Sequence, residues 1–160
     1  PLLFDSNYQK KQAYQAVLDA LNGGTPNPGT GAPLRSAASN RCLDVPNQTT
    51  ATGTRVQIYD CWSGANQLWT YTSAKELTVY TGDSRRCLDA SGAGTTNGTA
   101  VIIWTCHGGT NQKWNVNADG SITNAQSGLC LDVTGAATAN GTLVQLWSCS
   151  GGTNQRWALG

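Results

Sequence analysis

The side chains that could do chemistry in this sequence lie in two short motifs, each of which occurs three times. Cys-Leu-Asp begins at residues 42, 87 and 130, and Asn-Gln-x-Trp begins at residues 66, 111 and 154. An ionised aspartate only accepts hydrogen bonds, whereas an Asn or Gln side chain both donates and accepts them. Together the motifs favour a site that holds the hydroxyl groups of a neutral ligand.

Catalysis by the same residues is disfavoured. The sequence offers no nucleophile with an adjacent base, no metal-ligand cluster and no phosphate loop. Glu76 is the only glutamate, so no glutamate pair is available to act as nucleophile and acid in glycoside hydrolysis. We therefore expect a binding domain that carries no cofactor and no metal ion.

Six cysteines fall into three pairs, and the two members of each pair are separated by nineteen residues: Cys42 with Cys61, Cys87 with Cys106, and Cys130 with Cys149. If the repeats are structural copies, their pairing is copied too, which selects one disulfide inside each repeat. Zinc is the alternative, but the sequence has no CxxC motif and only one histidine. Disulfides predict an oxidising, extracellular destination.

Alignment on the first cysteine of each pair gives three repeats, at about residues 33–75, 76–119 and 120–160, with offsets of 45 and 43 residues. We place this length variation in loops rich in Gly, Thr and Asn, such as residues 90–100. Short β-rich segments exclude helical repeats, and a propeller needs about four blades or more. The remaining all-β solution is a closed threefold barrel, the β-trefoil.

Side-chain alternation sorts these segments into two faces. Val56 and Ile58, and their counterparts in the other repeats, face the core together with the leucine of Cys-Leu-Asp. The residue that follows points outward and is aromatic in all three repeats: Tyr59, Trp104 and Trp147. Packing is already satisfied by the inner face, so outward aromatics predict a function. The alternative is that these rings merely cover the disulfides.

The combined motifs resemble the ricin-type lectin domain, specifically carbohydrate-binding module family 13 of bacterial xylan-degrading enzymes. The resemblance covers roughly residues 33–160, and three motif pairs in register make it specific. It implies that the tryptophan of Asn-Gln-x-Trp is a core residue, that the glutamine braces the fold beside a pocket, and that the asparagine helps to receive a sugar.

Sugar binding fits the chemistry of these residues. A pyranose has a face of C–H groups that prefers an aromatic ring, and a rim of hydroxyls that needs fixed donors and acceptors. The resemblance therefore implies three sites with these members: Asp44, Tyr59, Asn66 and Gln67; Asp89, Trp104, Asn111 and Gln112; Asp132, Trp147, Asn154 and Gln155. The alternative for the aspartates is that they are turn residues after a strand.

The residue after the second cysteine of each pair differs: Trp62, His107 and Ser150. Family members can offer a polar side chain to the sugar from this position, and we add His107 to the predicted ligand contacts. Trp62 departs from the pattern, and either extends the stacking surface of the first site or packs. We expect three competent sites of unequal affinity, which act together on a polymer.

The amino-terminal part follows a different pattern. Residues 1–5 predict a strand or strand end, residues 10–21 an amphipathic helix, and residues 25–32 a Gly- and Pro-rich linker. Residues 1–21 resemble the last strand end and helix of the (β/α)₈ barrel in family 10 xylanases. This resemblance assigns residues 1–24 to the end of a catalytic domain of a retaining endo-1,4-β-xylanase. The alternative is a small helix that docks on the trefoil.

Composition limits the partners. Charged residues make up 12% and the formal net charge is +1, which leaves no basic footprint for nucleic acid. No apolar run approaches the roughly 18 residues needed to cross a bilayer. We predict a secreted monomer that is covalently linked to a xylanase domain. Its predicted ligands are xylan or other plant cell-wall polysaccharides and xylo-oligosaccharides, with galactose-containing sugars as second ligands. A stand-alone lectin, a trefoil for protein contacts and a glycosidase built on the three aspartates are the alternatives.

Overall fold

Short strands and single 3₁₀ turns make up the fold. The computed structural model describes residues 31–160, and all of its helices in that part of the chain are 3₁₀ turns. The strands are β1 Leu34–Ser36, β2 Cys42–Asp44, β3 Gln57–Tyr59, β4 Trp69–Tyr71, β5 Leu77–Val79, β6 Arg86–Ala90, β7 Val101–Trp104, β8 Trp114–Val116, β9 Ile122–Asn124, β10 Cys130–Val133, β11 Val144–Trp147 and β12 Trp157–Leu159. The 3₁₀ turns are η1 Pro46–Gln48, η2 Ala65–Gln67, η3 Gly82–Ser84, η4 Ser91–Ala93, η5 Thr110–Gln112, η6 Thr134–Ala136 and η7 Thr153–Gln155.

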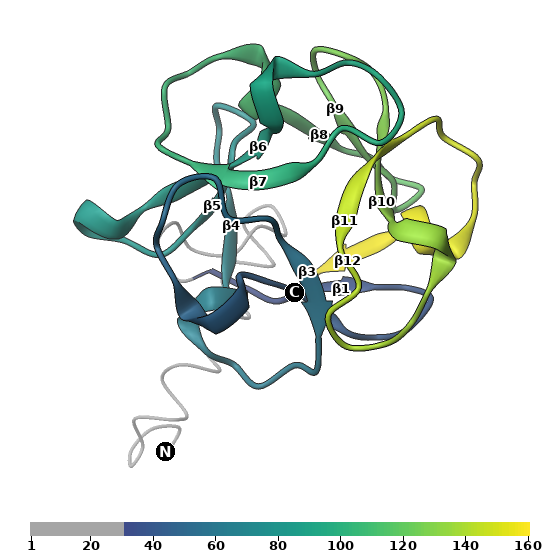
Figure 1. Ribbon diagram of the computed structural model, residues 1–160, viewed down its shortest axis with the longest axis horizontal. Coiled ribbons are helices and arrows are strands. Elements are labelled where there is room, and N and C mark those ends of the chain that lie inside the picture. Colours follow the sequence, from purple (N-terminus) through teal and green to yellow (C-terminus); the bar gives the residue numbers. More distant parts are fainter. Residues whose placement is uncertain (1–30) are drawn as a thin grey trace, which may run out of the picture.

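The strands form three antiparallel four-stranded sheets, and each sheet joins two sequence repeats. The strand orders are β12-β1-β2-β3, β4-β5-β6-β7 and β11-β10-β9-β8. The last strand of one repeat pairs with the first strand of the next, and β12 pairs with β1, with Leu34 opposite Leu159. This last pairing closes a threefold ring, which is visible around the centre of Figure 1. The predicted β-trefoil is confirmed.

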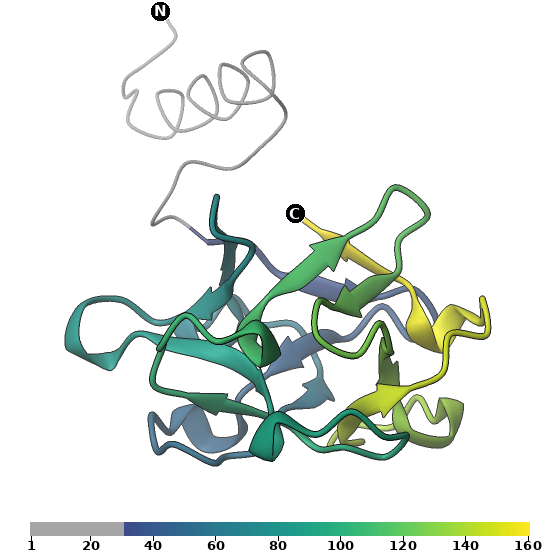
Figure 2. The same cartoon turned by 90° about the horizontal axis from the view of Figure 1, so that it is seen from above.

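The strands β3, β7 and β11 come together where the three repeats meet. The Val56 backbone N–H donates to the Val101 carbonyl, and the Val144 N–H donates to the Val56 carbonyl, both at 3.1 Å. Seen from the side, these strands lie toward one end of the fold, and the hairpins that join successive repeats lie toward the other (Figure 2). The carboxyl-terminal end of each of these three strands therefore reaches the surface at an equivalent position.

The predicted core residues are all fully buried: Leu43, Val56, Ile58, Leu88, Val101, Ile103, Leu131, Val144 and Leu146. Three tryptophans join them, since Trp69 and Trp114 are fully buried and Trp157 is 5% exposed. Each indole N–H donates to the carbonyl of the leucine in Cys-Leu-Asp, at 3.0, 3.0 and 3.1 Å. A buried indole needs such a partner, so the two sequence motifs are joined through the core.

The three predicted disulfides are present: Cys42–Cys61, Cys87–Cys106 and Cys130–Cys149. They exclude the zinc alternative for these cysteines. Each bridge links the Cys-Leu-Asp strand to the segment that follows the aromatic strand of the same repeat. A closed loop of about twenty residues contributes roughly 3 kcal/mol to stability in the chain-entropy account.

The length difference between repeats does not lie where we predicted it. Seven residues separate Val79 from Cys87, whereas five separate Ser36 from Cys42 and Asn124 from Cys130. The two extra residues therefore lie in the surface turn between β5 and β6, which contains η3. The loops rich in Gly, Thr and Asn keep one length because each bonds to the next repeat. In these contacts three backbone N–H groups donate at 2.8 Å: Gly53 to Ile103, Gly98 to Leu146 and Gly141 to Ile58.

The predictions for residues 1–24, and for all but the last two residues of the predicted linker, lie outside the described residues. Ala32 starts the described fold by exchanging two backbone hydrogen bonds with Trp69, at 2.9 and 2.8 Å. The linker thus meets the trefoil beside β4.

Candidate functional site

Three equivalent groups of polar and aromatic residues surround the ends of β3, β7 and β11. The aspartate is the last or second-to-last residue of the strand that contains Cys-Leu-Asp, and the aromatic residue is the last residue of the partner strand. The Asn-Gln pair lies on the 3₁₀ turn that follows. We call these groups site 1 (Asp44, Tyr59, Asn66, Gln67), site 2 (Asp89, Trp104, Asn111, Gln112) and site 3 (Asp132, Trp147, Asn154, Gln155).

The glutamine of each site joins the aspartate to a surface loop. In site 1 the Gln67 amide nitrogen donates to Asp44 Oδ2 at 2.8 Å and to a backbone carbonyl at 2.9 Å. Its Oε1 accepts from the Trp62 backbone N–H at 2.9 Å. Gln112 and Gln155 make the same three contacts. All three glutamines are buried, so each holds the carboxylate in a fixed orientation.

The asparagines lie deeper than we expected of residues that receive a sugar. Asn66 is 2% exposed and Asn111 9% exposed, while Asn154 is half-buried. Each side-chain nitrogen donates to the carbonyl of the residue after the aspartate, at 3.1 to 3.2 Å. In sites 1 and 3 the nitrogen also reaches the aspartate Oδ2. In site 1 the side-chain oxygen of Asn66 is itself buried, and the role of the three asparagines in binding stays a prediction.

Two further glutamines, which the sequence analysis missed, hold the other carboxylate oxygen. Gln57 donates to Asp44 Oδ1 at 2.9 Å, and Gln145 donates to Asp132 Oδ1 at 3.1 Å. Both lie directly opposite their aspartates in the strand register. The sequence carried a signal for them, because each stands two residues before the outward aromatic and therefore shares its face.

Site 2 has Ile102 at this position, so its carboxylate is held by fewer groups. Within the described residues, Gln112 makes the one hydrogen bond of good geometry to Asp89, at Oδ2, and Asn111 is a weaker side-chain donor to the same carboxylate. His107 Nε2 lies 3.8 Å from Asp89 Oδ2. Burial raises the pKa of the Asp89 carboxyl above its usual value, while Gln112, the charge of His107 and Asn111 oppose this shift.

The three aromatic residues face outward, at almost the same exposure. Tyr59, Trp104 and Trp147 are 43%, 42% and 44% exposed. Each lies opposite the first cysteine of its disulfide in the strand register, so a ring next to a bridge still offers about two-fifths of its surface to solvent. These rings can therefore act as stacking platforms as well as neighbours of the disulfides.

Site 3 is hollowed. Its cavity of about 490 Å³ brings together Asp132, Trp147, Asn154 and Gln155, which the sequence placed in one site, and adds Gln145, Ser150 and the turn Thr134–Ala136. The cavity thus has an aromatic wall, a carboxylate and several amides. This set can hold a ring with a hydroxyl rim.

Comparison with known proteins identifies the family of this chain. A sequence model of the ricin-type beta-trefoil lectin domain matches residues 30–157. The chain belongs to this family. Lectin domains of this type are carbohydrate-binding folds.

Three solved structures show the relationship in more detail. A designed threefold-symmetric protein, ThreeFoil, shares 34% identity and a TM-score of 0.72, over 80% of this chain and 96% of that chain. The exo-beta-1,3-galactanase 1,3Gal43A from Clostridium thermocellum shares 28% identity and a TM-score of 0.71, over 84% of this chain. A non-toxic type II ribosome-inactivating-protein homologue from Momordica charantia, in complex with alpha-methyl-D-galactoside, shares 26% identity and a TM-score of 0.68, over 81% of this chain. The chain spans 31% of the galactanase and 46% of the Momordica protein.

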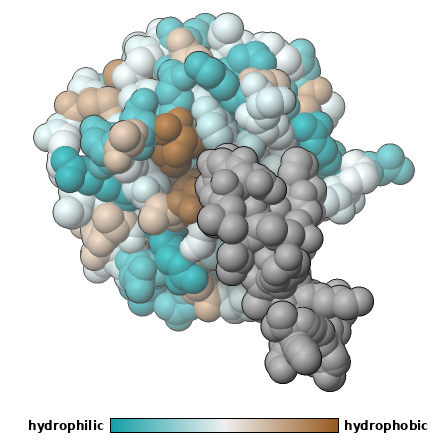
Figure 3. All heavy atoms as spheres, turned by 180° about the vertical axis from the view of Figure 1, so that it is seen from behind, coloured by the Kyte–Doolittle hydropathy of each residue, from teal (hydrophilic) through white to brown (hydrophobic). Residues whose placement is uncertain are grey.

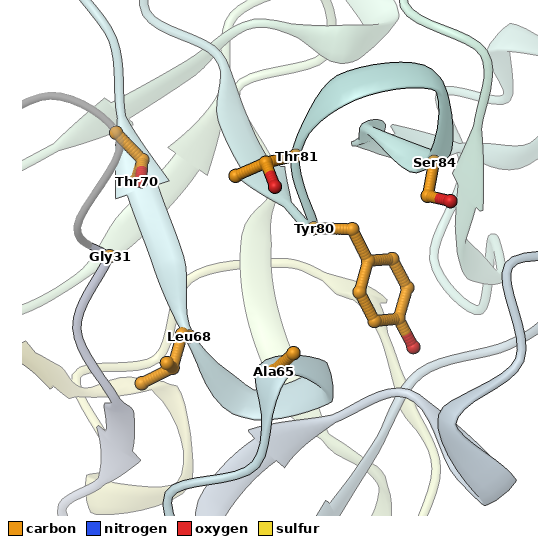
Figure 4. Close-up of a pocket in the computed structure, with 7 residues that line it drawn as sticks. All are labelled: Gly31, Ala65, Leu68, Thr70, Tyr80, Thr81 and Ser84. Atoms are coloured by element: carbon orange, nitrogen blue, oxygen red, sulfur yellow. The ribbon is translucent and has the colours of Figure 1, made fainter.

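This lectin domain has a second hollow, of about 330 Å³, at the junction of repeats 1 and 2 (Figure 4). The extra turn after β5 builds one wall with Tyr80, Thr81 and Ser84. The Tyr80 hydroxyl donates to the Thr49 carbonyl at 2.9 Å, and burial together with the charge of Asp44 raises the pKa of Tyr80 to about 12. No member of the three sites lines this hollow.

The described part of the face seen in Figure 3 is mostly polar. The view in Figure 3 shows strongly apolar residues only as a small group among hydrophilic ones. Within residues 31–160, no helix has the length and apolar character that a bilayer span requires. In the same part of the chain no group of His, Cys, Asp or Glu is placed to hold a metal ion.

Proposed function

We propose that this lectin domain binds a neutral polysaccharide, first of all xylan and its oligosaccharides, through sites 1, 2 and 3. The observation that carries the proposal is the threefold occurrence of one chemical set: a carboxylate fixed by a buried glutamine, beside an aromatic ring that exposes about two-fifths of its surface. A carboxylate can accept from two neighbouring sugar hydroxyls, and the ring can stack on the C–H face.

The three sites act by avidity. The aspartates are 3 to 5% exposed, so a sugar reaches only the edge of each carboxylate, and a single site is weak. Once one site holds a polymer, the others meet neighbouring chain segments at high effective concentration. Avidity then exceeds the single-site affinity by roughly 10² or more where the geometry permits. A long polysaccharide is therefore the preferred ligand.

The domain anchors an endo-1,4-β-xylanase to this substrate. Residues 1–24 resemble the end of a family 10 catalytic barrel, and the lectin fold resembles carbohydrate-binding module family 13. A similar domain occurs within the exo-beta-1,3-galactanase of Clostridium thermocellum, of which this chain matches 31%, so attachment of this fold to a glycoside hydrolase has a precedent. Three disulfides favour secretion of the whole enzyme.

Galactose-containing glycans are the second candidate ligand. The Momordica charantia homologue is in complex with alpha-methyl-D-galactoside, and another similar protein is a galactanase. The three sites offer the same hydrogen-bonding groups to either sugar class, so a direct competition decides between them.

Affinity electrophoresis tests the proposal. We expect soluble xylan to retard the domain more than galactan does, and we expect the retardation to be lost when Asp44, Asp89 and Asp132 are changed to alanine together. A control variant replaces two exposed aspartates outside the sites, Asp83→Ala with Asp119→Ala. Circular dichroism verifies that both variants fold. Retardation of the folded triple variant equal to that of the control would reject the proposal, and stronger retardation by galactan would select the second ligand.

A further inference from the structure

The residue after the second cysteine occupies the same place in all three sites. The backbone N–H groups of Trp62, His107 and Ser150 donate to the Oε1 atom of the site glutamine, at 2.9, 3.0 and 2.7 Å. Their main chains are thus fixed in one way, and only the side chains differ. Site 1 has an indole where site 3 has a hydroxymethyl group.

All three side chains turn toward a glycine two residues further on. A Cβ atom added to Gly64 would overlap Trp62 Cζ2, and one added to Gly109 would lie 2.6 Å from His107 Cε1. Gly64 has an ordinary φ of −72°, so the glycine makes room for the indole and is not needed for the backbone conformation. The indole packs against the main chain at Gly64, which is buried.

This place belongs to the ligand site. In site 3 the corresponding Ser150 lines the cavity together with Asp132 and Trp147. In site 1 the same place holds Trp62, which is 53% exposed, the largest exposed fraction among the large hydrophobic residues of the described chain. Site 1 therefore presents two exposed aromatic side chains, Tyr59 and Trp62, where the other sites present one.

Site 1 also has an unpaired oxygen on its asparagine. Asn66 Oδ1 is buried and has no hydrogen-bond donor, which is unfavourable for a carbonyl oxygen. A sugar on the exposed rings does not reach this atom, so the added contact in site 1 comes from the second ring.

We propose that Trp62 makes site 1 a two-ring site. Tyr59 stacks one pyranose beside Asp44, and Trp62 stacks the next pyranose of the same linear chain. Sites 2 and 3, with His107 and Ser150, hold one ring each. The inference rests on the proposed carbohydrate binding and assigns the selection of chain length to one residue.

Site-resolved NMR titration of the folded domain with xylose and xylobiose tests this inference. We expect the affinity of site 1 to rise roughly tenfold from xylose to xylobiose, as one added aromatic contact allows, and the affinities of sites 2 and 3 to change by less than about twofold. Trp62→Ser installs the residue of site 3, and should remove the preference of site 1 while its binding of xylose persists.

The reciprocal variant Ser150→Trp keeps the inference testable if Trp62→Ser disturbs site 1. It should give site 3 a preference for xylobiose. An equal ratio of the two affinities in all three sites of the unmodified domain would overturn the inference, as would an unchanged ratio in both variants. A parallel titration with galactose and galactobiose covers the second ligand class. Absence of binding at every site with both sugar series would instead overturn the proposed function, and the inference with it.

Discussion

Sites 2 and 3 have the same architecture but hold their carboxylates differently. Asp132 in site 3 accepts three amide N–H groups, from Gln155 at 2.8 Å, Gln145 at 3.1 Å and Asn154 at 3.2 Å. Asp89 in site 2 accepts one of comparable geometry, from Gln112 at 2.8 Å, with Asn111 as a weaker donor. The conserved geometry of the Gln-x-Trp turn is therefore enough to place the carboxylate. The residue opposite it on the neighbouring strand decides how firmly the second oxygen is held.

This difference has two opposing consequences for binding. Asp89 Oδ1 has free lone pairs, so site 2 can accept from more sugar hydroxyls than site 3. However, a carboxylate that is held at one oxygen is less preorganised, and its raised pKa reflects burial that its partners only partly offset. We expect the loss of preorganisation to dominate, which makes site 2 the weaker site.

Removal of the site glutamine should have the largest effect on stability, and this effect should differ between sites 2 and 3. Gln112→Ala leaves the buried Asp89 with Asn111 as its one weak donor, whereas Gln155→Ala leaves Asp132 with two amides. Both variants lose the contact to the loop after the disulfide. We expect Gln112→Ala to lower the free energy of unfolding by about 1–2 kcal/mol more than Gln155→Ala does. Urea denaturation measures this difference, and equal losses would show that the additional amides of site 3 contribute nothing.

Exchange of the strand residue should convert one site into the other. Ile102→Gln adds an amide opposite Asp89, and we expect it to strengthen sugar binding at site 2 about fivefold, as one hydrogen bond of about 1 kcal/mol implies. The matched variant Gln145→Ile should weaken site 3 by a similar factor. Site-resolved NMR titration with xylobiose reports both. No change at either site would mean that the second oxygen plays no part in binding.

Acid should weaken site 2 through Asp89. An ionised carboxylate accepts hydroxyl groups, and protonation removes part of this capacity. Because burial raises the pKa of Asp89 above its usual value, the affinity of site 2 should fall as the pH is lowered through that raised pKa. Ile102→Gln stabilises the ionised form, so it should move this loss to lower pH. A pH series of the same titration measures the midpoint, and a midpoint unaffected by Ile102→Gln would contradict the account.

Substitution of His107 should have the smallest effect. Its Nε2 atom lies 3.8 Å from Asp89 Oδ2, beyond hydrogen-bond distance, and its side chain is 46% exposed. Solvent screens an interaction of this kind. We expect His107→Ser, which installs the residue of site 3, to change the affinity of site 2 by less than about twofold at neutral pH. A larger loss would identify His107 as a direct ligand contact, which the resemblance to the family implies.

Most of the fold could be predicted because the sequence contains three repeats. The cysteine spacing predicted the disulfides, and the alternation of Val56 and Ile58 predicted the core face, since strand periodicity needs no knowledge of neighbouring strands. The roles of Gln57 and Gln145 required the register between two strands. The position of the extra turn near Tyr80 required the contacts between repeats, because those contacts fix the length of the other loops.

The depth of the asparagines was also beyond sequence reasoning. The polar sequence around Asn66 predicts an exposed turn, yet the Asn66 side-chain nitrogen donates to the Val45 carbonyl across the site. That contact depends on how closely the 3₁₀ turn approaches β2, and this distance is a property of the packed fold. The face on which each strand residue lies was predictable, whereas the contacts between residues on opposite sides of the site were not.

A crystal structure with xylobiose or galactose soaked in at saturating concentration tests the central claim most directly. The account predicts a sugar ring stacked on each of Tyr59, Trp104 and Trp147, with hydroxyls donating to Asp44, Asp89 and Asp132. Sugar bound only elsewhere, for example in the hollow beside Tyr80, with all three aromatic rings bare, would contradict it.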